Sequence, residues 1–79
     1  MPTTEELAIA LAEDVLKAVE ETGDEALVGD INKIIEASSS ALQEAYMAAI
    51  RAQRSEAKAR EMLAARLKKA RAAQAQRTG

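Results

Sequence analysis

Cysteine, histidine, tryptophan and phenylalanine are all absent from this sequence of 79 residues. Without cysteine no disulfide framework can form. Without histidine the chain lacks the commonest metal ligand and the commonest general base. Tyr46 is the single aromatic residue, which excludes recognition of nucleic acid by stacking bases on an aromatic platform. We therefore expect no cofactor, no bound metal and no catalytic site.

The hydrophobic residues are numerous but small. They make up 48% of the sequence, and half of them, 19 residues, are alanine, which favours helices and buries little surface. No run of about 18 apolar residues occurs, so we expect no transmembrane helix and no membrane partner. The acidic, amphipathic start of the chain differs from a signal peptide, and the expected localisation is cytoplasmic. The composition predicts an all-α protein with long helices and thin contacts.

Positive and negative charges are separated along the chain. Residues 1–44 hold eleven acidic and two basic side chains, a net charge of −9, whereas residues 45–79 hold two acidic and nine basic side chains, a net charge of +7. Such a split is typical of a basic arm for a polyanion or of self-association between unlike halves. We therefore divide the chain into an acidic helical hairpin core, residues 1–44, and a basic, alanine-rich helical extension, residues 45–79, whose C-terminus frays.

Local signals place a first helix at about residues 4–21. Thr3 and Glu6 have the spacing of a capping box, in which each side chain accepts a hydrogen bond from the other residue's backbone N–H. Gly23 supplies a left-handed C-cap, and Asp24 is placed to cap the helix that follows. The sequence thus predicts a helical hairpin that turns at Gly23.

The rest of the chain contains no proline and predicts one long second helix, about residues 25–75. Two places are candidate breaks in it. Gly29 precedes an aspartate that could begin a new helix, and the serines at Ser38–Ser40 compete for backbone hydrogen bonds. The sequence does not choose between them, and we expect the helix to continue through both.

Self-association is the leading functional hypothesis, because the first helix is too short to cover the second. Small side chains let two helices approach closely, and an antiparallel dimer that crosses near Ala48 would place each acidic hairpin beside the partner's basic segment. Ile31 and Ile35 would then cover Leu63 and Leu67. The expected product is a dimeric bundle or antiparallel coiled coil, and its association residues are Leu27, Ile31, Ile34, Ile35, Leu42, Ala45, Ala49, Ala52, Leu63 and Leu67.

The basic segment supports an alternative, in which the chain binds nucleic acid. Basic side chains along a helix can follow a phosphate backbone and give salt-dependent affinity without sequence preference. The same side chains could meet an acidic protein partner, or could simply be solvated near a helix C-terminus. The residues expected to contact a polyanion or an acidic partner are Arg51, Arg54, Lys58, Arg66, Lys68, Lys69 and Arg71.

These observations together favour a non-enzymatic structural or adaptor protein that acts through helix–helix contacts, alone or within a larger assembly. Nucleic-acid binding is the second hypothesis, and a polypeptide inhibitor or regulator of a larger complex is the third. The serines at Ser38–Ser40 have no histidine to activate them. The acidic residues around Gly23 lack the ligand spacing of a calcium loop.

Overall fold

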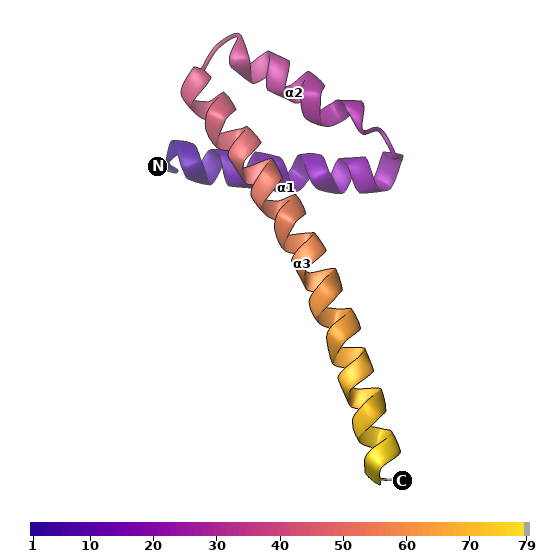
Figure 1. Ribbon diagram of the computed structural model, residues 1–79. Coiled ribbons are helices and arrows are strands. Elements are labelled where there is room, and N and C mark those ends of the chain that lie inside the picture. Colours follow the sequence, from indigo (N-terminus) through magenta and orange to yellow (C-terminus); the bar gives the residue numbers. More distant parts are fainter. Residues whose placement is uncertain (79) are drawn as a thin grey trace.

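The computed structural model describes residues 1–78, which form three helices: α1 (Thr4–Thr22), α2 (Ala26–Glu36) and α3 (Ser40–Thr78) (Figure 1). These residues contain no strand. The prediction of an all-α fold is therefore confirmed. The prediction of a single second helix over residues 25–75 is wrong, because that stretch is divided into α2 and α3.

The first helix begins and ends as the sequence predicts. Thr3 N donates to Glu6 Oε1 at 3.1 Å, and Glu6 N donates to Thr3 Oγ1 at 3.1 Å, which completes the capping box. Gly23 has a φ of 73° and forms the left-handed C-cap. Asp24 Oδ1 accepts a hydrogen bond from Ala26 N at 3.1 Å, in the first turn of α2. These local hydrogen bonds fix the turn between α1 and α2.

The break between α2 and α3 lies at the serines, whereas Gly29 lies inside α2. Ser38 N and Ser39 N both donate to the carbonyl oxygen of Ile35, at 3.0 and 2.8 Å. Ser39 Oγ then accepts from Leu42 N at 3.2 Å. A serine oxygen bound to a backbone N–H in the first turn is an N-cap, so Ser39 begins a new helix and lets the chain reverse direction.

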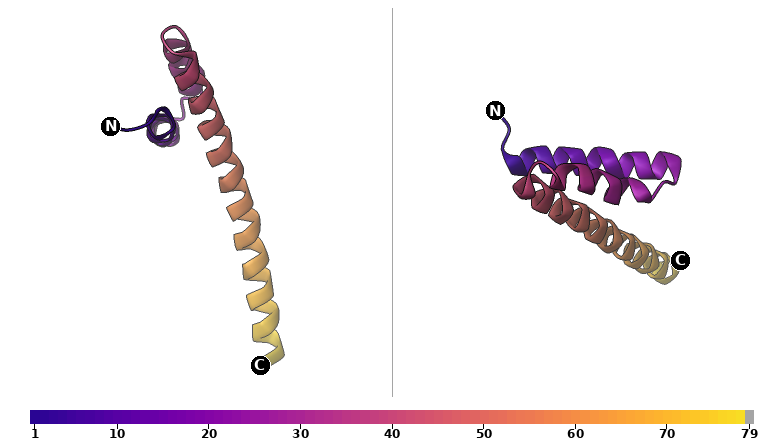
Figure 2. Two further views of the ribbon diagram at one scale, coloured as in Figure 1. Left: turned by 90° about the vertical axis from the view of Figure 1, so that its left-hand side faces the viewer. Right: turned by 90° about the horizontal axis from the view of Figure 1, so that it is seen from above.

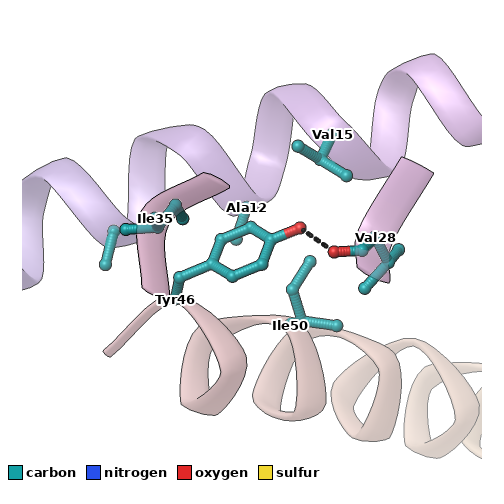
Figure 3. Packing of buried hydrophobic residues seen from close by; sticks show 7 residues of the cluster. Ala12, Val15, Val28, Ile35, Tyr46 and Ile50 are labelled. Carbon is teal, nitrogen blue, oxygen red and sulfur yellow. Dashed lines mark hydrogen bonds between the residues drawn. The ribbon is translucent and has the colours of Figure 1, made fainter. Parts of the chain in front are cut away.

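The hydrophobic core lies where all three helices meet. α1 packs mainly against α3, and α2 covers the first turns of α3. The small side chains of α1 allow its close approach to α3. Tyr46 is fully buried and lies between α1 and α2 in Figure 3. The buried residues are Ala8, Ala12 and Val15 from α1, Val28 and Ile35 from α2, and Tyr46 and Ile50 from α3.

The molecule is elongated because α3 continues far beyond this core (Figure 2). Its dimensions are 62 × 28 × 17 Å and its radius of gyration is 18.0 Å, against about 12 Å for a compact chain of this length. We call residues 1–53 the head, since they contain the core, and residues 54–78 the extension. α3 is helical through Thr78, and fraying of its end in solution stays a prediction.

Candidate functional site

The extension is the most unusual part of the molecule, because every residue from Arg54 to Arg77 is exposed. It continues α3 without a break from the head, and at its start an ion pair joins Arg54 Nη2 to Glu25 Oε2 of the head, 2.9 Å apart. Most helices in proteins owe their stability to packing against a neighbour. Alanine-rich composition supports this helix locally, although no neighbouring element covers Leu63 or Leu67.

Two leucines form an apolar stripe on the extension. Leu63 is 56% exposed and Leu67 is 42% exposed, and four-residue spacing places them on one side of the helix. Leu63 follows Ala45 by about five full helical turns, so the two residues face the same way. Met62, 64% exposed, points about 100° away from Leu63. The leucine stripe therefore lies in line with the alanine face of the head, with Glu56 on the same side between them.

That alanine face borders a shallow apolar groove between α1 and α3. The groove is open to solvent and has a volume of about 270 Å³. Ile9, 48% exposed, contributes its largest side chain. Sequence reasoning did not single out Ile9, because its role depends on α1 crossing α3, which no local signal predicts. The lining residues are Glu5, Ile9, Ala45, Ala48, Ala49 and Ala52.

The residues predicted for self-association occupy three different environments. Ile35 is buried in the core, and Leu27, Ile31 and Leu42 pack against it. Ile34 is 70% exposed on α2, apart from the groove. The remaining five share the face of α3 that runs from the groove to the leucine stripe: Ala45 and Ala49, which also pack against the core, and Ala52, Leu63 and Leu67.

The predicted polyanion contacts are exposed but do not form one stripe. Lys58 and Lys69 share one side of α3, about three turns apart, whereas Arg71 lies on another side. Arg60 Nε pairs with Glu56 Oε2 at 3.4 Å within the helix. All seven predicted cations are exposed: Arg51, Arg54, Lys58, Arg66, Lys68, Lys69 and Arg71. The head carries a net charge of −8 and the extension +6.

Tyr46 is the one titratable group with a clearly perturbed pKa in the described residues. Burial disfavours the phenolate and raises the pKa of Tyr46, while the positive charge of Arg54 acts in the opposite direction. Its O–H donates to a backbone carbonyl inside the core, so its role is structural. No three acidic, histidine or cysteine side chains within residues 1–78 converge as a metal site. Sequence reasoning missed Tyr46 as a core residue.

Comparisons with protein-family models, curated proteins and solved structures find no match to this chain. Among residues 1–78, no helix combines the length and apolar character that a membrane span requires. The exposed face of α3, with the groove beside α1, is therefore the candidate site that the geometry itself defines.

Proposed function

We propose that this chain is a structural or adaptor protein that works by helix–helix self-association, with the extension as its association surface. The observation that carries the proposal is the exposure of Leu63 and Leu67 on the part of α3 that lies beyond the core of its own chain. Two exposed leucines at helical spacing, on a segment whose other side chains are mostly alanine or charged, are typical of a face that packs against another helix.

The charges of head and extension support association between copies. A positively charged extension is attracted to the negatively charged head of another molecule, and is repelled by another extension. Because these charges are exposed, salt screens them at distances beyond about 10 Å at 0.1 M ionic strength. With few bulky apolar residues in the extension, association is expected to be moderate in strength and to weaken as salt increases.

Analytical ultracentrifugation tests this proposal directly. The chain should sediment as an oligomer at about 50 mM salt and shift toward monomer at about 0.5 M salt. Replacing both Leu63 and Leu67 by serine should abolish the oligomer and leave the helical circular dichroism signal unchanged. Ile34→Ser is the matched control, since Ile34 is equally apolar and more exposed but lies outside this face. A monomer at every concentration and at both salt levels would refute self-association.

Nucleic-acid binding is a second candidate, favoured by the number of exposed cations around the extension. It predicts that affinity for a short RNA or DNA duplex, followed by fluorescence anisotropy, falls steeply as salt increases. Lys58→Glu with Lys69→Glu should weaken this binding. The leucine-to-serine variant should bind as before if the contacts are to phosphates alone. Affinity that is flat with salt would dismiss this candidate.

A further inference from the structure

We propose that the extension of one copy docks antiparallel into the groove of a second copy, with Leu63 across from Ala52 and Leu67 across from Ala48. This inference rests on the self-association proposed above and specifies its surface, orientation and register. It makes the leucine stripe and the groove the two halves of one interface. Each dimer then contains the same contact twice, as in an isologous two-fold interface.

The shapes of the two surfaces are complementary. Ala48 and Ala52 are exposed on the side of α3 that borders the groove, where their short side chains leave the groove open. Leucines spaced by one turn can enter between alanines spaced by one turn, as side chains of one helix enter spaces on another. Ile9 lies beside these alanines and supplies an apolar wall for the incoming leucines.

The charges select the antiparallel orientation. In a parallel pair, two extensions of charge +6 would lie side by side, whereas in the antiparallel pair each extension lies along a head of charge −8. Like charges placed together disfavour the wrong orientation more than unlike charges strengthen the right one. The antiparallel arrangement therefore follows from the separation of charge along the chain.

Specific ion pairs follow from this arrangement. Glu5 and Glu13 lie one turn before and one turn after Ile9 on the same side of α1, and both border the hollows next to α3. On the extension, Arg60 and Arg71 lie about three turns apart on one side, the side that faces α1 in the head. When a two-fold axis relates two antiparallel helices, the α1-facing side of one helix and that of the other lie on the same face of the dimer. Arg60, which in the single chain pairs with Glu56 at 3.4 Å, then approaches Glu13 of the second copy, and Arg71 approaches its Glu5.

The proposed register differs from the crossing near Ala48 that the sequence led us to expect. A crossing near Ala48 needs Ile31 and Ile35 to cover the partner's leucines, but Ile35 is buried in its own core and Ile31 packs against it. The register proposed here places the two-fold axis near Ala57 and Lys58, beyond the core, where the residues of α3 are exposed.

Disulfide trapping tests the register, because the chain has no cysteine of its own. Ala52→Cys combined with Leu63→Cys should give a covalent dimer under mild oxidation, whereas each single substitution should not. Ala52→Cys with Met62→Cys is the matched control, since Met62 points to another side of the same turn. A covalent dimer from Leu63→Cys alone would show either a parallel pair or an antiparallel pair that crosses at Leu63, and would overturn this inference while leaving self-association intact.

Charge exchange tests the orientation without oxidation. Glu13→Arg and Arg60→Glu should each weaken the dimer several-fold at low salt in sedimentation, and together they should restore it. Lys58→Glu makes the same change of charge on a different side of the extension and should not be rescued by Glu13→Arg. Equal rescue by both would overturn the proposed contact. A wild-type chain that sediments only as a monomer would overturn this inference together with the proposed function.

Discussion

Tyr46 Oη on α3 donates a hydrogen bond to the carbonyl oxygen of Val28 on α2, at 3.0 Å and out of contact with solvent. The bond joins two residues eighteen positions apart in the chain and holds α2 over the beginning of α3. Because the tyrosine ring also packs between α1 and α2 (Figure 3), this residue contributes both apolar burial and a specific polar contact. The head depends on it in two separable ways.

Tyr46→Phe separates those two contributions. The ring and its packing remain, but the hydrogen bond to Val28 is lost. We expect the free energy of unfolding to fall by about 1 kcal/mol, measured by urea denaturation followed by circular dichroism. Tyr46→Ala should cost about 3 to 5 kcal/mol, because it also removes the buried ring. Equal stability of Tyr46→Phe and the wild type would mean that the hydrogen bond contributes nothing to the fold.

The raised pKa of Tyr46 predicts a loss of stability in alkali. The unfolded chain releases the phenolic proton near the ordinary value of 10.0, whereas the folded chain holds it to higher pH. The stabilising contribution is therefore complete below pH 10 and is lost as pH rises toward the folded pKa. Urea denaturation at about pH 8 and about pH 11 should show this loss in the wild type and less of it in Tyr46→Phe. An identical pH dependence in both proteins would contradict it.

The same substitution should have opposite effects at two glycines. Gly23 has a φ of 73°, so Gly23→Ala strains the backbone and should reduce stability by about 1 kcal/mol or more. Gly29 lies inside α2 with open space around the position of a Cβ atom. Gly29→Ala should therefore raise stability by about 0.5 to 1 kcal/mol, because alanine favours the helix. Thermal denaturation of both variants checks the signs, and destabilisation by Gly29→Ala would contradict the continuous α2.

Ser39 can be tested as the residue that begins α3. Ser39→Ala removes the hydrogen bond from Leu42 N to the serine oxygen and should lower the free energy of unfolding by about 1 kcal/mol. Ser40→Ala is the control, since Ser40 is the first residue inside the helix. Equal effects of the two substitutions would show that the Ser39 cap does not define the break.

Local features of the fold were predictable from sequence, and long-range ones were not. Thr3, Glu6 and Gly23 form hydrogen bonds or backbone conformations that depend on nearby residues alone, and the structure confirms them. Ser38–Ser40 were recognised as a candidate break, because serine side chains compete for backbone hydrogen bonds. Whether this competition ends a helix depends on what the following residues pack against. Here Tyr46 and Ile50 gain burial only when the chain reverses, and that gain is not visible in local spacing.

The candidate surface was likewise predictable only where it depends on local sequence. Leu63 and Leu67 were predicted as association residues from their place on a thinly apolar helix, and the structure shows that they are exposed. The groove that includes Ile9 was not predicted, because it exists only where α1 crosses α3. Ile35 was predicted for association but lies in the core, since one apolar stripe can serve either purpose and sequence alone does not distinguish them.

α3 runs without a break from the core to Thr78. The direction in which the leucine stripe points is therefore fixed relative to the groove. One alanine inserted between Ala57 and Met62 would turn the leucines by about 100° relative to the groove and leave both surfaces intact in themselves. Seven inserted residues would nearly restore the original angle, at a separation about 10 Å greater. The number of residues between the groove and the leucines therefore decides, as much as their identity does, which surface a second molecule contacts.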